Sequence, residues 1–238
     1  MKLSTQSHTH AGPSLLALAI VHTLFFAANL IAGALLRHGA IFVNPYGPAE
    51  SARQFFAGNP EALRVAAFFF FSSSIPLGIY TATVVSRLRF LGVRAAGSDI
   101  ATYGGYAASA AIAFSGLSTW ILSVTEVAAS LPVTRMLHFF SFLCGGTAFA
   151  VGFGLLAAGV SVTSLFLRLL PRWLVWFGLF IALAGELSTL GLVLYQATMT
   201  IPIVRFGGFV WLIAVGALLP NSIAKNSAPN SPGGEAGS

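Results

Sequence analysis

Charged side chains are scarce in this sequence. Asp, Glu, Lys and Arg make up 8% of its 238 residues, whereas an ordinary soluble domain carries about 25%. Twelve basic and six acidic residues are too few to cover the surface of a soluble protein of this size. The composition therefore excludes a soluble globular domain, and the high apolar content excludes a disordered chain. An integral membrane protein remains.

Two residue types that carry much of enzyme chemistry are almost missing. Cys144 is the one cysteine, so the chain forms no disulfide within itself and no CxxC zinc or iron–sulfur site. Asp99 is the one aspartate, which excludes the Asp clusters that hold Mg²⁺ and the paired aspartates of proteases. No GxSxG, HExxH or Walker A motif is present. We therefore predict no metal site and no cofactor; an enzyme without a familiar motif stays open.

Long apolar runs take the place of these motifs. The run from Leu15 to Leu36 carries no formal charge, and at about 1.5 Å per residue it crosses an apolar core of about 30 Å. Five further runs of similar character follow it. The sequence therefore predicts an all-α integral membrane bundle of six transmembrane helices, at about 15–36, 62–86, 100–126, 133–163, 173–196 and 202–220.

Two segments outside these spans have characters of their own. Residues 48–58 begin with Pro48 and end with Gly58, which are typical of a helix start and a helix end. They predict an amphipathic helix at the membrane interface between the first two spans; a lid over a cavity is the alternative. Residues 221–238 are rich in Ser, Pro, Gly and Asn and predict a disordered tail, which leaves 1–220 as a single membrane domain.

Six spans place both ends of the chain on one side of the membrane, and the basic residues indicate which side. With the N-terminus inside, the inner segments hold seven Lys or Arg residues and the outer segments hold five. In the short loops alone the bias is five to two. Because short cytoplasmic loops are enriched in Lys and Arg, we predict that both termini are cytoplasmic.

Small residues recur at every fourth position in the third and fourth spans, and the two series mirror each other about the turn that joins the spans. Small residues let helices approach closely in lipid, which is how helices associate there. We therefore predict that these two antiparallel helices pack through four pairs of residues. The pairs are Ala101 with Ala158, Gly105 with Gly154, Ser109 with Ala150 and Ala113 with Gly146.

Ionisable and polar residues inside the predicted spans are the candidates for a site. Glu186 lies about 21 Å from the inner end of its span by helix rise, where a carboxyl group is costly and needs a partner inside the bundle. Asn29 lies at a similar depth, and Arg205 lies near the outer end of the sixth span. Glu126 and His138 flank the outer end of the third and fourth spans. We predict a ligand pocket of these five residues, open to the outer face; a structural carboxyl at Glu186 is the alternative.

Two histidines, His22 and His138, lie within predicted spans. By helix rise their depths differ by more than about 10 Å, whereas two axial ligands of a haem meet at one iron. The sequence therefore argues against a haem, and we expect His22 to bridge two helices by a hydrogen bond.

Several short stretches carry a resemblance. They are Pro171-Arg-Trp-Leu-Val-Trp-Phe-Gly, then Gly207-Gly-Phe-Val-Trp-Leu-Ile-Ala-Val-Gly in the last span, and Ile75-Pro-Leu-Gly-Ile-Tyr with Ser86-Arg-Leu-Arg. This pattern resembles one in a family of bacterial multi-span integral membrane proteins whose domain has no assigned function. The resemblance implies a bundle in the bacterial cytoplasmic (inner) membrane. It carries over no activity and no catalytic residue.

Three functions stay open at this point. The first is binding or transport of a small molecule through the outward-facing pocket around Glu186. The second is a membrane scaffold or subunit that binds another protein, or a second copy of itself, through its small-residue faces. The third is an intramembrane enzyme with Glu126 and His138 as an acid–base pair, which requires the two side chains within hydrogen-bond reach. Every case predicts contact with the lipid bilayer; nucleic acid is not expected, because the basic residues are scattered singly.

Overall fold

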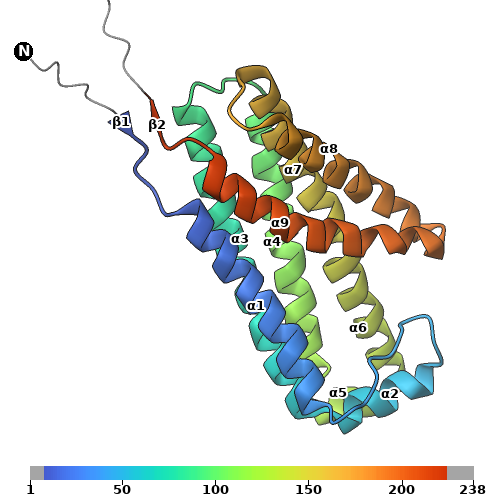
Figure 1. The fold of residues 1–238 in the computed structure, drawn as a ribbon. Helices are drawn as coiled ribbons and strands as arrows, with labels where there is room; N and C mark the ends of the chain where they lie inside the picture. The colour runs from blue at the N-terminus through green and yellow to red at the C-terminus, as the bar shows by residue number, and fades with distance from the viewer. Residues whose placement is uncertain (1–7, 224–238) are drawn as a thin grey trace, which may run out of the picture.

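The computed structural model describes residues 8–223, and nearly all of them are helical (Figure 1). Five stretches of this part are long and apolar enough to cross a membrane: Leu15–Leu36, Pro60–Phe90, Leu131–Leu167, Arg172–Leu192 and Tyr195–Leu218. The helices are α1 (Leu15–Leu36), α2 (Ala49–Gly58), α3 (Pro60–Phe90), α4 (Gly97–Ile121), α5 (Thr125–Ala129), α6 (Leu131–Leu143), α7 (Phe149–Leu167), α8 (Arg172–Leu187) and α9 (Thr200–Leu218). The described residues are helical, and their long apolar helices are those that the composition predicts for a membrane protein.

The helix bounds follow the predicted spans with four differences, one of which is that the predicted span 173–196 is α-helical only to Leu187, the end of α8. The first span coincides with α1, whereas α3 runs several residues past its predicted span at the C-terminal end. The predicted span 100–126 is broken, because α4 ends at Ile121 and a turn separates it from the short α5. The predicted span 133–163 is one rod in which a π-helical turn, η1 (Cys144–Ala148), joins α6 to α7. Two short 3₁₀ helices, η2 (Ser188–Leu192) and η3 (Tyr195–Met199), connect α8 to α9.

Six helical rods form a ring at one end of the molecule. Each rod packs against the next in the order α1, α3, α4, α7, α8 and α9, and α9 packs back against α1. Figure 1 shows α8 and α9 inclined across the longer helices at this end only. At the other end α6 packs against α4, α2 and α5, while α1 keeps α3 as its main neighbour. The bundle is therefore closed at one end and less completely closed at the other.

A pair of two-residue strands joins the two ends of the described chain. Strand β1 (His8–Thr9) runs antiparallel to β2 (Ser222–Ile223), and the His10 amide donates to the Asn221 carbonyl at 2.7 Å. The His10 ring also lies 3.0 Å from the Ser86 hydroxyl of α3, and burial followed by the charge of Arg87 lowers its pKa. The predicted disordered tail begins within this pair at 221–223, and its remainder, 224–238, lies outside the described residues.

The α4 and α7 helices pack closely through glycine, but not through the predicted pairs. A Cβ atom on Gly104 would lie 2.5 Å from the Gly152 carbonyl oxygen, and one on Gly159 would lie 2.7 Å from the Ala101 nitrogen. Of the predicted partners, Gly105 instead faces Thr81 of α3, and Gly154 faces Ala182 of α8 at 3.1 Å. The antiparallel contact is therefore present with different residues.

Helix geometry explains why the predicted pairing is wrong. A step of four residues turns a helix through about 400°, so a series spaced by four drifts about 40° per step. The α4 residues that meet α7 are Gly97, Ala101, Gly104 and Ala108, which alternate steps of four and three and so stay on one face. The other predicted residues rotate onto further neighbours: Ser109 donates to the Ser74 carbonyl of α3, Ala150 meets Gly185 of α8, and Gly146 meets Ile201 of α9. Ala113 and Ala158 are half-buried.

The α3 helix continues through Pro76 and exchanges polar contacts with its neighbours nearby. The His22 imidazole Nδ1 lies 2.8 Å from the Ser73 carbonyl oxygen, which links α1 to α3 as predicted. The Ser109 hydroxyl of α4 likewise donates to the Ser74 carbonyl at 2.7 Å, so that side chains of α1 and α4 both bond to the α3 backbone in the turn before Pro76.

Candidate ligand cavity

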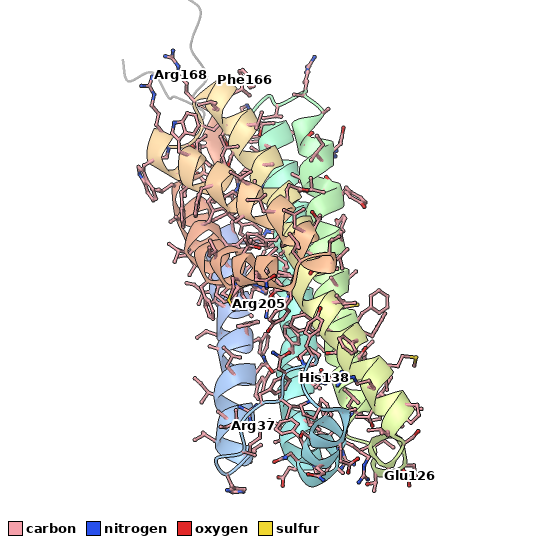
Figure 2. All side chains as sticks on the ribbon, turned by 90° about the vertical axis from the view of Figure 1, so that its right-hand side faces the viewer. Arg37, Glu126, His138, Phe166, Arg168 and Arg205 are labelled. Carbon is pink, nitrogen blue, oxygen red and sulfur yellow. The ribbon has the colours of Figure 1, made fainter. Side chains whose placement is uncertain are left out.

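A cavity of about 610 Å³ lies in the less completely closed half of the bundle. Its walls come from α1, α3, α4, α6 and α9, and it is covered by the segment 37–48 and by η3. Figure 2 shows Arg205, His138 and Arg37 at successive levels along this half of the molecule. Five helices and two connecting segments, distant in sequence, therefore build one site.

Arg205 of α9 is the central polar group of the cavity. Its guanidinium carbon lies 5.0 Å from the ring centres of Phe26 and Phe149 and 5.8 Å from that of Phe70. One guanidinium nitrogen donates to the Gly145 carbonyl, and the buried Nε has no hydrogen-bond partner among the described residues. The aromatic faces attract the cation, but they supply no negative charge.

The π-helical turn η1 presents the carbonyl that Arg205 binds. Within it the Phe149 amide bonds to the carbonyl five residues earlier, at Cys144. Single π turns inside helices are frequent at functional sites. Glycine is required here, because a Cβ atom on Gly145 would lie 2.5 Å from the Ser115 hydroxyl of α4. The turn therefore brings α4, η1 and Arg205 together at one end of the cavity.

Hydroxyl groups form a polar wall between α4 and α6. Ser115 donates to the Ser141 carbonyl at 2.8 Å, and Thr119 lies 3.0 Å from the Ser141 hydroxyl. All three residues line the cavity, and Asn29 of α1 lines it as well. These groups give one side of an otherwise apolar cavity the capacity to hold water or a polar part of a ligand.

His138 and Arg37 lie toward the other end of the cavity. The His138 side chain is buried, and its ring packs edge-on against Phe42 and Phe56 at 6.1 and 4.9 Å between ring centres. Neither of its ring nitrogens has a hydrogen-bond partner within residues 8–223. The Arg37 guanidinium lies over the Phe42 ring at 5.7 Å.

The segment 37–48 is fastened to η3 at the cavity mouth. The Asn44 amide donates to the Tyr195 hydroxyl at 2.8 Å, and the Tyr46 ring packs edge-on against Tyr195 at 4.7 Å. Arg135 of α6 donates to the Gly47 carbonyl at 2.7 Å. These contacts hold an irregular segment in place over the cavity.

The structure brings three of the five predicted site residues together. Asn29, Arg205 and His138 all line the cavity. Glu186 lies on the exposed side of the last turn of α8, and Glu126 is exposed on α5 at the end of the bundle (Figure 2). His138 has no hydrogen bond to Glu126, so the acid–base pair that the enzyme hypothesis needs is not formed in this structure.

The charged residues that line the cavity are all positive. Its charged lining residues are Arg37 and Arg205, and no carboxylate of residues 8–223 lines it. The ion pairs of this part of the chain are Arg53 with Glu50 and Arg89 with Asp99, both away from the cavity. The positive charge of Arg205 is therefore not balanced by a carboxylate in contact with it.

Several important residues of the site were not singled out from the sequence. The phenylalanines around Arg205 look like ordinary lipid-facing residues in a sequence rich in Phe, and Gly145 looks like any packing glycine. Arg37 reads as a helix-end anchor. The available signal was that Ser115, Thr119 and Ser141 are hydroxyl residues clustered at one depth of two adjacent predicted spans.

Comparison with known proteins adds no assignment. No protein-family model, curated protein or solved structure matches this chain.

Proposed function

We propose that this chain is a six-span protein of the cytoplasmic membrane that binds an anionic small molecule in the Arg205 cavity. The surroundings of Arg205 support this most directly: a guanidinium lies beside a cavity inside the bundle, among three phenyl rings, and no carboxylate of residues 8–223 forms an ion pair with it. A charge inside a membrane is costly, and such residues mark ligand or ion sites. A bound anion supplies the opposite charge.

The positive charge of the cavity lining favours an anionic ligand over a cationic one. Two basic side chains line the cavity without a carboxylate, and a site lined by one sign of charge with apolar walls concentrates ions of the opposite sign. A cationic ligand would meet repulsion from Arg205 with no compensating group. Guanidinium groups also match carboxylates and phosphates geometrically, since they present parallel N–H donors.

Two features of the fold support six spans. If the α3 rod and the α6–α7 rod cross the membrane, then α4, which joins opposite ends of these rods, crosses it too (Figure 1). The pairing of β1 with β2 puts both ends of the described chain at the same end of the bundle, which supports an even number of crossings. The α4 helix is less apolar than the other five stretches because it is rich in Ala, Gly, Ser and Thr.

The basic residues support a cytoplasmic location of the end that carries the β1–β2 pair. Figure 2 labels Arg168 at that end and Arg37 at the opposite one. The turns at the first end hold most of the Arg residues in short loops, as cytoplasmic loops do. The α2 helix buries Phe55 and Phe56 against the bundle and exposes Glu50 with Arg53, which supports an interfacial position at the opposite end. Lys2 and Lys225, which belong to the seven basic residues of the inner segments, lie outside the described residues.

The function is tested by thermal unfolding of the purified protein in a nonionic detergent, with sodium benzoate against sodium chloride at equal ionic strength. Benzoate is expected to raise the melting temperature of the unmodified protein, because a ligand of the folded state stabilises it by about 2.7 kcal/mol at a hundredfold excess over Kd. Arg205→Met should abolish this shift, with Arg205→Gln as a second neutral variant.

Two controls accompany this measurement. Arg172→Met removes an exposed arginine of α8 and should leave the benzoate shift unchanged, while Arg205→Lys keeps the charge and should keep part of it. The same shift in the neutral Arg205 variants, or no shift in the unmodified protein, would contradict the proposed function.

A further inference from the structure

Building on the proposed function, we infer that the ligand is an amphiphile, whose acid group binds at Arg205 and whose apolar body lies along the cavity after entering sideways from the lipid. The inference depends on the dimensions of the cavity, the chemistry of its walls and the side on which it opens.

The cavity is too long and too large for an inorganic anion alone. On α1 its lining extends from Phe26, beside Arg205, to Arg37, and eleven residues of helix rise correspond to about 16 Å. The volume of about 610 Å³ lies within the range of about 300–1,000 Å³ that is typical of pockets for organic ligands. A halide, sulfate or phosphate at Arg205 would leave most of this space unfilled.

The wall beyond Arg205 is apolar and is built from small residues where α1 meets α3. Gly33 of α1 lies so close to Ala66 of α3 that a Cβ atom on the glycine would approach that of the alanine to 3.3 Å. Both residues line the cavity, together with Leu63 and Leu30. Such a wall offers no hydrogen bonds to a second anion. Burial of a hydrocarbon chain against it is favourable, because the chain is removed from water.

The open side of the cavity faces the hydrocarbon layer. At this end α1 packs against α3 while α6 packs against α4 and α2, so the gap between α1 and α6 is covered by the segment 37–48 and η3 rather than by a helix. Leu30 of α1 lines the cavity and is 47% exposed. Ile31 of α1 and Phe140 of α6 flank this side and are likewise exposed. A molecule dissolved in the bilayer would therefore enter between α1 and α6, where the irregular segment 37–48 and η3, rather than a helix, cover the cavity.

A chain-length series tests this inference in the protein used above. Straight-chain carboxylates from butanoate to octanoate are titrated by thermal shift, with octyltrimethylammonium as the cation of matched tail. We expect the apparent affinity of the carboxylates to rise about three- to fourfold for each methylene that enters the apolar part of the cavity. The cation should give no shift that depends on Arg205.

A pair of alanine variants on α3 locates the tail. Ala66→Leu fills the apolar part of the cavity and should lower the affinity for octanoate at least tenfold more than it lowers the affinity for butanoate, whose chain is too short to reach that part. Ala82→Leu adds the same side chain on an exposed face of the same helix that does not line the cavity, and should leave both ligands unaffected. A cooperative unfolding transition of Ala66→Leu without ligand shows that this variant is folded.

The outcomes separate the two proposals. If benzoate and butanoate both bind through Arg205 but affinity does not increase with chain length, the ligand is a small anion; the amphiphile is then overturned and the anion site stands. If octanoate stabilises the Arg205→Met variant as well as the unmodified protein, the chains insert nonspecifically and the amphiphile is overturned. If benzoate also fails to raise the melting temperature of the unmodified protein, the anion site is overturned too.

Discussion

Most buried hydroxyl groups in this bundle are satisfied within their own helix. Thr81, Thr83 and Ser118 each donate to the backbone carbonyl four residues earlier, and Ser73 and Ser188 donate to the carbonyl three residues earlier. A hydroxyl bonded in this way needs no partner on another helix. The side chains that do reach across helices, such as His22, Tyr80 and Arg205, therefore contribute more to the specific arrangement of the bundle.

Tyr80 provides a measurable example. Its side chain is fully buried, and its hydroxyl donates to the Leu212 carbonyl of α9 at 3.1 Å. Tyr80→Phe removes this bond and keeps the ring, so we expect a loss of about 0.6 kcal/mol, the average for such bonds between membrane helices. The loss is measured by unfolding in mixed micelles. Tyr103→Phe, at a tyrosine that is 69% exposed on α4, is the matched control and should change nothing.

Sequence reasoning identified Arg205, Asn29 and His138 because polar residues within apolar runs are conspicuous and have to be placed inside a bundle. It could not place Glu186, because depth along a helix says nothing about which face a residue occupies. The buried face of α8 contains Gly178, Ala182 and Gly185, and Glu186 lies one position past the last of these, on the exposed side. The cage around Arg205 could not be predicted, since its three phenylalanines come from three helices far apart in sequence.

At the scale of elements, the glycine contact between α4 and α7 sets how closely these two helices approach. Gly104→Ala would place a methyl group 2.5 Å from both the Gly152 carbonyl oxygen and the Leu155 Cβ atom. We expect a loss of about 1–3 kcal/mol, as for other overpacked sites, measured as a lower melting temperature in detergent.

Gly58 supplies the control for this substitution. It lies at the end of α2, and a Cβ atom added there meets nothing within 4 Å. Gly58→Ala should therefore leave the melting temperature unchanged or raise it slightly, because alanine favours helix more than glycine does. An equal loss in both variants would mean that the contact between α4 and α7 is not the cause.

The lengths of the apolar runs predicted most of the helices well. They did not predict the helix ends that are set by hydrogen bonding rather than by hydropathy. The α3 helix continues to Phe90 past the predicted end of its span because Arg87 and Arg89 extend a hydrogen-bonded helix as readily as apolar residues do. The π turn at Cys144–Ala148 adds one residue to a helical turn and leaves no mark in the hydropathy of the sequence.

For the whole molecule, the number of crossings depends on α4. Five stretches qualify as spans by length and hydropathy, yet five crossings would separate the two ends that β1 and β2 hold together. A helix made of small residues crosses a membrane when its neighbours cover it, and α4 is covered by α3 and α7. The small residues of α4 lie where it packs against α3 and α7, and they lower its hydropathy, whereas its outer face exposes large side chains such as Tyr103, Phe114 and Trp120.

Cysteine labelling tests the crossing of α4. In a Cys144→Ala background, Ala95→Cys and Thr125→Cys place single thiols at exposed positions just outside the two ends of α4. A membrane-impermeant maleimide should label Thr125→Cys in intact cells, and Ala95→Cys only after the membrane is opened. The Cys144→Ala protein alone reports background. Labelling of both thiols from the same side would show that α4 does not cross.

The β1–β2 pair has a consequence for how the gene for this protein could be rearranged. Because His8 lies opposite Ile223, a short peptide could join these two positions and turn the described chain into a closed circle. The circle could then be opened at the exposed turn after Gly92, between α3 and α4. Every helix would keep its direction across the membrane, since the new ends would lie at the same end of the bundle as the old ones. The order of synthesis would change, so that α4 entered the membrane first and α3 last, while the helix contacts and the cavity stayed the same.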